Sequence, residues 1–239
     1  MATLVSLTLT PLLITDGLEH WDGRTEQVPS TGRASLFARS IAARLPDDLP
    51  PDRALAVFDV CGAPALTERI VSRYRESTPN PVIAVIGGAG KSGSLALAAA
   101  STLGVTTIGV VPTESEASAL SDAGLADRVV VCDARDPIAL STAVQEAGGP
   151  ADVTVVCVDV PGCEGGAILS TAQGGTVIFF SMATQFAAAA LGAEGLASDI
   201  TMIIGNGYLP GHAERALDLY RRHAGVRALF ARRVGDTEP

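Results

Sequence analysis

The sequence predicts an α/β protein whose core is a parallel sheet, and three observations lead to that class. From Pro81 onward, short apolar runs alternate with helix-like segments in a regular rhythm. The first of those runs ends in a cluster of glycines. Hydrophobic residues make up 47% of the chain and aromatic residues only 4%, which suits parallel strands covered by helices better than an aromatic-rich β-sandwich.

Residues 1–80 have a different pattern. Strands are expected over Thr3–Leu9 and Ala34–Phe37, and the Pro- and Asp-rich residues 45–51 predict a helix start. That helix is expected over Asp52–Val57 and, after an interruption near residues 62–64, over Ala65–Arg75. Two strands without a partner sheet cannot make an independent core, so this segment is predicted to be the last part of a larger β domain.

The rest of the chain predicts six strands, each followed by a helix. About 10–15 helical residues between successive strands indicate right-handed crossovers and therefore a parallel sheet. The strands are expected over Val82–Ile86, Thr106–Val111, Arg128–Cys132, Val153–Val158, Thr176–Phe180 and Ile200–Ile204. The helices are expected over Ser92–Leu103, Glu114–Ala123, Pro137–Ala147, Gly162–Ala172, Phe186–Leu191 and Gly211–His223.

The glycine-rich loop after the first of these strands predicts the ligand. Gly88, Gly90 and Gly93 form a G-x-G-x-x-G pattern. Gly88 is expected to permit a tight turn, Gly90 to admit a pyrophosphate, and Gly93 to let the helix pack closely on the strand. The helix N-terminus, with Lys91 and Ser92, would hold the phosphates. A P-loop needs a glycine five residues before Gly90, where this chain has valine, so the spacing favours a Rossmann-type doubly wound sheet.

These patterns predict four segments: a partial β segment at 1–50, a connecting helix at 51–80, a Rossmann dinucleotide-binding domain at 81–210, and a C-terminal helix and tail at 211–239. The choice between NAD and NADP normally depends on the residue that ends the second strand. Neither an Asp nor an Arg is close to that point in the sequence. Glu114 either binds a ribose hydroxyl, which gives NAD a slight preference, or only starts the next helix.

Charge and cysteine content exclude several classes of function. The formal net charge of −9, from 17 basic and 26 acidic residues, argues against a nucleic-acid partner. No apolar stretch is long enough to span a membrane and no secretory leader is recognised, so we expect a cytoplasmic protein with no membrane partner. The cysteines are scattered without a C-x-x-C pair or a His at ligand spacing, so neither a metal site nor a disulfide framework is expected.

Several segments resemble the L-erythro-3,5-diaminohexanoate dehydrogenase family, which is related to the medium-chain dehydrogenases/reductases. Together they touch nearly the whole chain, and the later ones are more distinctive than the glycine loop. They are Ala2–Leu12, Arg44–Ala65, the loop with Lys91–Gly93, Val160–Glu164, Phe179–Thr184, Met202–Tyr208 and Gly211–Glu214. The resemblance implies that residues 1–50 are part of a GroES-like β domain that is N-terminally truncated in this chain.

The resemblance also implies an activity: NAD(P)-dependent oxidative deamination of L-erythro-3,5-diaminohexanoate to 5-amino-3-oxohexanoate, a step of lysine fermentation. The implied partners are a small diamino acid substrate and NAD or NADP, and we expect a homo-oligomer. Two alternatives stay open. One is a zinc-free quinone or enoyl reductase of the medium-chain superfamily, and the other is a catalytically degenerate nucleotide-binding subunit.

In a doubly wound sheet the ligand lies beyond the carboxyl ends of the strands. That position adds Val160, Ser181 and Asn206 to the glycine loop and Glu114 as candidate cofactor-binding residues. Val160, Ser181 and Asn206 each come shortly after a predicted strand, and Glu114 starts the helix that follows the second strand.

Deamination requires a base for the substrate ammonium and for water, and Asp59, Glu164 and His212 are the candidates. Asp59 lies in an apolar segment, where burial is costly without a partner, so it is either functional or part of a structural ion pair. Glu164 is either a base at the cleft mouth or a first-turn helix acid. His212 is either an acid/base group or a surface histidine. Cys61 either lies near the nicotinamide or is a packed thiol.

Overall fold

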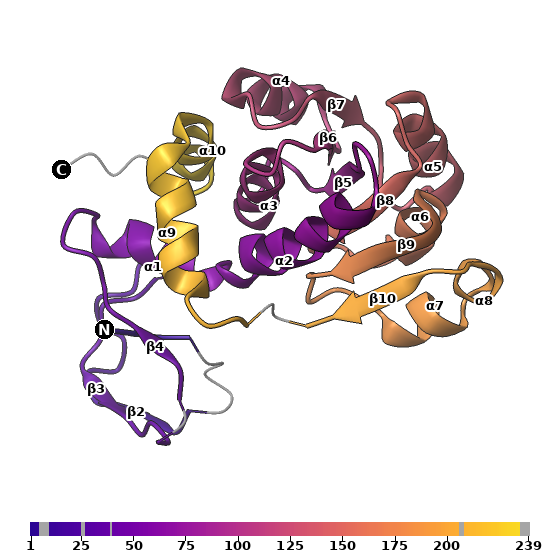
Figure 1. Ribbon diagram of the computed structural model, residues 1–239. Helices are drawn as coiled ribbons and strands as arrows, with labels where there is room; N and C mark the ends of the chain where they lie inside the picture. Colours follow the sequence, from indigo (N-terminus) through magenta and orange to yellow (C-terminus); the bar gives the residue numbers. More distant parts are fainter. Residues whose placement is uncertain (5–9, 25–26, 39, 206–207, 235–239) are drawn as a thin grey trace. The chain divides into compact units, whose positions relative to one another are not determined.

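The computed structural model describes residues 1–4, 10–24, 27–38, 40–205 and 208–234. The chain divides into two compact units, Met1–Asp59 and Val60–Pro239. The first consists mostly of short β ladders and irregular backbone, and the second contains a six-stranded sheet with its helices (Figure 1). Each unit is described separately below.

The N-terminal unit contains two short antiparallel ladders and one helix. β1 (Ala2–Thr3) pairs with β4 (Ala42–Ala43), β2 (Leu12–Ile14) pairs with β3 (Gly32–Ala34), and α1 covers Pro51–Asp59. The strand expected at 34–37 therefore lies at 32–34, and β2 and β4 were not predicted. Ladders of two or three residues are too short to produce an alternating pattern. Residues 5–9 of the other expected strand lie outside the described residues.

The larger unit contains a six-stranded parallel sheet in the order β10-β9-β8-β5-β6-β7. Counted along this unit, the order is that of a Rossmann fold, with the crossover point between the first and fourth strands. The predicted fold class is confirmed. The strands are β5 (Val82–Ile86), β6 (Thr106–Val111), β7 (Arg128–Val131), β8 (Ala151–Val156), β9 (Thr171–Phe179) and β10 (Thr201–Ile204).

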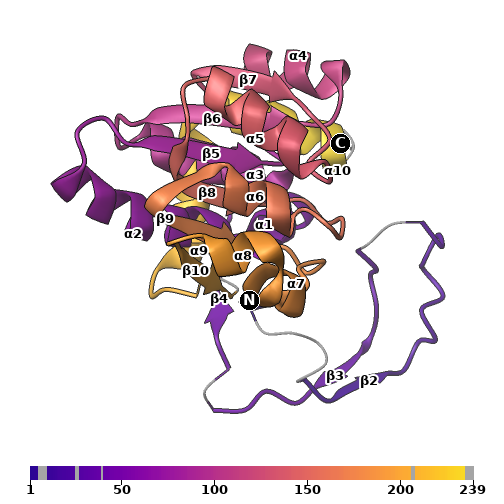
Figure 2. The same cartoon turned by 90° about the vertical axis from the view of Figure 1, so that its right-hand side faces the viewer.

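Helices cover both faces of this sheet (Figure 2). One face carries α2 (Gly62–Ser77), α3 (Lys91–Ser101), α4 (Glu114–Ala123), α9 (His212–Arg222) and α10 (Ala224–Val234). The other carries α5 (Pro137–Glu146), α6 (Glu164–Leu169), α7 (Phe186–Leu191) and α8 (Ala193–Ala197).

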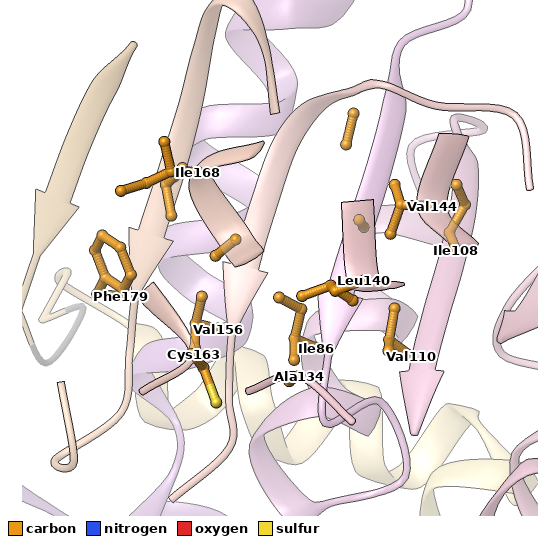
Figure 3. Close-up of a cluster of buried hydrophobic side chains, with 14 of the residues drawn as sticks. Ile86, Ile108, Val110, Ala134, Leu140, Val144, Val156, Cys163, Ile168 and Phe179 are labelled. Atoms are coloured by element: carbon orange, nitrogen blue, oxygen red, sulfur yellow. The ribbon is translucent and has the colours of Figure 1, made fainter. Parts of the chain in front are cut away.

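The two covered faces explain why the central strands are continuous apolar runs and do not alternate. On the α5 and α6 face, Ile86, Ile108 and Phe179 from three strands pack with Leu140 and Ile168 from the helices, all nearly inaccessible to solvent (Figure 3). On the opposite face, α3 is buried along most of its length. Its alanines allow this, because small side chains let a helix be enclosed on several sides.

Local signals set the helix ends. Thr113 caps α4 by accepting a hydrogen bond from the amide of Glu116, and Gly124 ends that helix in the left-handed conformation with φ 62°. Asp136 caps α5, which has proline in its first turn. These residues are the side-chain N-caps, C-cap glycine and N1 proline that helix ends favour.

One predicted helix end was wrong, and one helix was not predicted. The helix expected at 162–172 ends at Leu169, because Thr171 already pairs with Ala151 in the sheet. The helix expected as the last one stops at Arg222, and a further helix, α10, follows. It forms because Val226, Leu229 and Phe230 share one face and are buried.

Candidate functional site

The glycine loop lies at the carboxyl edge of the sheet, directly after β5. Its first two amides, those of Gly87 and Gly88, both donate to the carbonyl of Val110 in β6, at 2.9 and 3.1 Å. The residue with positive φ is Gly87, at +85°. The tight turn therefore belongs to Gly87 and not, as expected, to Gly88. An added Cβ at Gly88 would instead meet the side chains of Leu120 and Leu97 at 3.0 and 3.1 Å.

The closest packing in the loop occurs at Gly93. A Cβ there would lie 2.1 Å from the carbonyl oxygen of Gly87, so the helix can approach the loop only because this residue is glycine. The expected role of Gly93 in helix–strand packing is confirmed. At Gly90 an added Cβ would come within 3.3 Å of the same oxygen, which leaves the backbone open to a ligand.

The residues present fit a pyrophosphate group. α3 begins at Lys91, and its N-cap is Gly90, which supplies no side-chain cap. The amide of Ser94 donates to the carbonyl of Gly90 at 2.9 Å. The positive end of the helix dipole and the first-turn amides therefore lie beside a loop of glycines, which have no side chains. This combination favours phosphate binding. Lys91 and Ser92 are half-buried at this end.

The other predicted cofactor residues occupy the same edge, insofar as they are described. Glu114 is exposed in the first turn of α4, Val160 is exposed in the loop after β8, and Ser181 follows β9. The hydroxyl of Ser181 accepts a hydrogen bond from the amide of Ala183 at 3.0 Å. Asn206 lies outside the described residues.

Arginines lie near the start of α4, although none is close in sequence. Arg232 of α10 donates to the hydroxyl of Ser115, and Arg233 pairs with Glu116. The sequence around the second strand does not reveal this contact, because it joins residues 117 positions apart. The sequence did contain a signal for this contact, because Arg232 and Arg233 are adjacent and directly follow the apolar residues of a helix.

Glu164 is not at an open cleft mouth, because only 5% of it is exposed. It is the first residue of α6, and its carboxylate Oε1 accepts a hydrogen bond from the backbone amide of Gln185 at 2.7 Å. The side chain thus joins the segment after β8 to the segment after β9, which contain the candidate cofactor-binding residues Val160 and Ser181.

His212 is buried, with 7% exposed, and the alternative of a surface histidine was wrong. It starts α9, and its ring meets that of Tyr208 edge to face with centroids 5.0 Å apart. Burial lowers the pKa of His212 below its usual value, against a smaller opposing effect of Glu214. The imidazole is therefore predominantly neutral at pH 7 and able to accept a proton.

Asp59 ends α1 in the N-terminal unit, and its side chain is exposed. Cys61 is buried at 3% exposure. Burial raises the pKa of Cys157, after β8, to about 12 and that of Cys163 to about 11, so both are neutral thiols at physiological pH.

The described residues have four further features, which concern cysteines, metal ligands, membrane-crossing helices and a hollow. None of the four cysteines forms a disulfide, and the described residues contain no group of three metal-ligating side chains. No membrane-crossing helix is found in the described part of the chain. A hollow of about 610 Å³ lies at the amino edge of the sheet, opposite the glycine loop, and is lined by residues that include Thr106, Asp127 and Arg128.

Sequence comparison gives matches over almost the whole chain. Residues 1–46 match the family model described as the L-erythro-3,5-diaminohexanoate dehydrogenase N-terminal domain. Proteins named L-erythro-3,5-diaminohexanoate dehydrogenase from Acetoanaerobium sticklandii and Fusobacterium nucleatum subsp. nucleatum are 40% and 43% identical over 235 residues. These alignments cover 96% of this chain and 66% of each relative.

Solved structures with the same fold are more distant in sequence. AibC has a TM-score of 0.58 at 23% identity, with 77% of this chain and 53% of that chain covered. Mycobacterial Rv1454c complexed with NADPH has a TM-score of 0.52 at 21% identity, with 80% and 63% covered. Alcohol dehydrogenase TADH from Thermus sp. ATN1 has a TM-score of 0.53 at 23% identity, with 77% and 52% covered.

Proposed function

Because the chain belongs to the L-erythro-3,5-diaminohexanoate dehydrogenase family, we propose that it catalyses the NAD(P)-dependent oxidative deamination of L-erythro-3,5-diaminohexanoate to 5-amino-3-oxohexanoate. The observation that carries the proposal is the 40–43% identity along 96% of the chain. The chain spans 66% of the length of those relatives. A dehydrogenase role agrees with the dinucleotide-binding architecture of the sheet.

In this reaction the bond between C3 of the substrate and its hydrogen breaks. The nicotinamide supplies a hydride acceptor. The resulting imine takes up water and releases ammonium to give the 3-oxo product, so one water is consumed and one proton is released. The protein must therefore hold the substrate amine next to the hydride acceptor and provide a group that accepts and returns protons.

The proposed cofactor site consists of the glycine loop and the strand ends beside it. Gly88, Gly90 and Gly93 leave room for the pyrophosphate, while the first turn of α3, with Lys91 and Ser92, binds it. The remaining predicted members of the site are Glu114, Val160, Ser181 and Asn206.

We propose His212 as the proton acceptor. It lies in the segment that follows β10, its ring is buried, and the low pKa keeps it in the basic form. Replacing His212 with Gln should lower kcat strongly while the dissociation constant of NADH changes little. An unchanged kcat and an unchanged pH profile would contradict this role.

Glu164 is proposed as a positioning residue. Its bond to the amide of Gln185 fixes the segment that contains Ser181. Glu164→Gln retains an acceptor oxygen and should rescue most of the activity lost in Glu164→Ala, which a role as proton acceptor would not allow. Asp59 is left out of the proposed site, since it is exposed and belongs to the N-terminal unit.

The proposal includes a homo-oligomer. Large apolar side chains are exposed on and next to α7 and α8, among them Met182 at 89%, Leu191 at 70% and Leu196 at 72%. Such patches often mark association surfaces. The molar mass in solution, measured by light scattering, tests it, and a monomer at all concentrations would contradict it.

The activity is tested in two steps. The purified protein is titrated with NADH and NADPH by fluorescence, and 3,5-diaminohexanoate is then added with the oxidised cofactor while NAD(P)H absorbance is followed. Turnover with release of ammonia supports the proposal. Cofactor binding without turnover would indicate a degenerate subunit, and turnover of an enone instead would indicate a quinone or enoyl reductase.

A further inference from the structure

The end of β6 lacks the group that usually reads the 2′ position of the adenosine ribose. In doubly wound folds this group is an acidic residue for NAD or a nearby arginine for NADP. Here β6 ends at Val111, and Pro112 and Thr113 follow. The hydroxyl of Thr113 already accepts a hydrogen bond from the amide of Glu116 at 3.2 Å. Besides Glu114, a neighbouring element supplies polar groups at this position.

That element is α10, which packs against α4 and α3 (Figure 1). It runs antiparallel to α4. Near its start, a Cβ on Gly225 would lie 2.0 Å from the carbonyl oxygen of Ala123, the last residue of α4. At its end, Arg232 and Arg233 reach the first turn of α4. The two arginines therefore lie near the carboxyl end of β6, where α4 begins.

The position of α10 is fixed by buried contacts. Val226, Leu229 and Phe230 are buried, and the ring of Phe230 meets that of Tyr220 in α9 edge to face, with centroids 5.3 Å apart. The close approach at Gly225 fixes the position of α10 along the axis of α4. The arginine side chains therefore project from a helix that has little freedom to slide.

The two arginines differ in their partners. The guanidinium of Arg233 pairs with the carboxylate of Glu116, whose side chain is only 25% exposed. Arg232 donates to the hydroxyl of Ser115 at 3.4 Å, and within the described residues it has no carboxylate partner. Its side chain is exposed. Arg232 thus presents a positive charge beside a hydroxyl, while Arg233 neutralises the half-buried carboxylate of Glu116.

We infer that Arg232, together with the hydroxyl of Ser115, binds the 2′-phosphate of NADP(H), so that this chain accepts NADP(H) as well as NAD(H). Guanidinium groups bind phosphate through strong, charge-assisted hydrogen bonds. Arg233 acts indirectly by neutralising Glu116, whose charge would otherwise repel the phosphate. The inference rests on the proposed function, since it requires a dinucleotide at the glycine loop, and it names the residues that select between the two cofactors.

The test is a fluorescence titration with NADH and with NADPH, which requires no turnover. In Arg232→Ala the dissociation constant of NADPH should rise about tenfold or more, while that of NADH stays within about twofold. Arg128→Ala, at the amino edge of the sheet, removes one positive charge far from this position and serves as the matched control. Thermal unfolding of each variant verifies that it is folded.

A second pair of variants tests the indirect role. Arg233→Ala should also weaken NADPH binding, and the additional change Glu116→Gln should restore it, because the repelling charge is then gone. Failure of the proposed function would show as binding of neither dinucleotide to the unaltered protein. The inference is overturned if NADH binds but NADPH does not, or if Arg232→Ala weakens both cofactors equally or neither.

Discussion

Replacing Gly93 with Ala tests the geometry of the glycine loop directly. The new Cβ would lie 2.1 Å from the carbonyl oxygen and 2.8 Å from the carbonyl carbon of Gly87. Both atoms belong to the backbone, so no side-chain rotation relieves the contact. Overpacking of this kind costs about 1–3 kcal/mol, and the better helix propensity of alanine offsets at most about 1 kcal/mol. A net loss of about 1–2 kcal/mol is expected.

For a protein of this size that loss lowers Tm by about 2–8 °C. The displaced loop should also weaken NADH binding at least tenfold, or about 1.4 kcal/mol. Circular dichroism melts and fluorescence titrations measure the two effects. The control is Gly165→Ala in α6, where a Cβ would meet only Glu194, at an ordinary 3.4 Å, and stability should not fall. Unchanged Tm and NADH affinity in Gly93→Ala would refute the reasoning.

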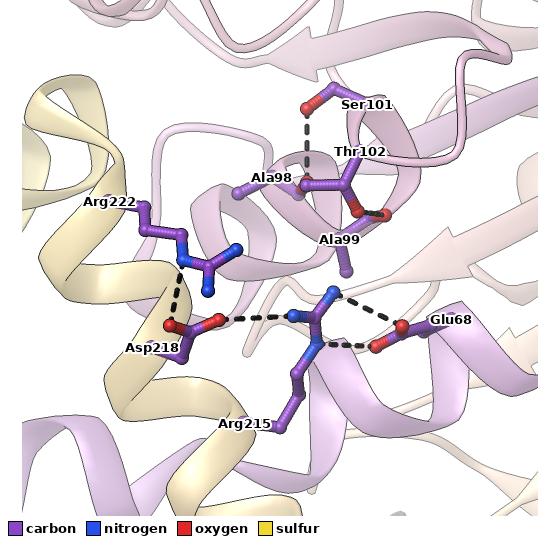
Figure 4. Close-up of polar contacts among 8 residues, drawn as sticks. All are labelled: Glu68, Ala98, Ala99, Ser101, Thr102, Arg215, Asp218 and Arg222. Atoms are coloured by element: carbon purple, nitrogen blue, oxygen red, sulfur yellow. Dashed lines mark hydrogen bonds and ion pairs between the residues drawn. The ribbon is translucent and has the colours of Figure 1, made fainter.

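Three further predictions concern the scaffold. Leu140→Ala, at a fully buried position, should lower the free energy of unfolding by about 2–5 kcal/mol in urea titrations; a loss below 1 kcal/mol would contradict the packing. Arg215 contacts Glu68 at 2.7 and 3.1 Å between α9 and α2 (Figure 4), and a double-mutant cycle should give a coupling of about 1 kcal/mol that falls with salt. The pKa of Cys163 is raised from 9.0 to about 11 and that of Cys157 to about 12. The unfolded thiols lose protons first, so the free energy of unfolding should decrease as pH rises above 9 and level off near the folded pKa values. Cys163→Ala should reduce this slope, and an identical slope would argue against the burial effect.

The sequence determined the sheet because its information is local. Each central strand is a short apolar run rich in β-branched residues, and each following helix has its own start signal, such as Thr113 or Asp136. The glycine spacing likewise predicted the tight loop after β5, since Gly90 and Gly93 act through backbone clearance within a few residues. The short strand β2 was not predicted, because it pairs with residues about twenty positions away and is too short to leave a periodic pattern.

Only the tertiary structure decided the environment of the polar candidates. The sequence left two alternatives open for Glu164 and for His212, and burial in the folded chain excluded the open cleft mouth for Glu164 and the surface position for His212. Burial determines whether His212 is neutral and whether Glu164 holds a loop, because desolvation and hydrogen bonding depend on every element around a group. The placement of Arg232 beside Ser115 is the clearest case. It arises from two helices packed antiparallel, and no local pattern in either helix records the other.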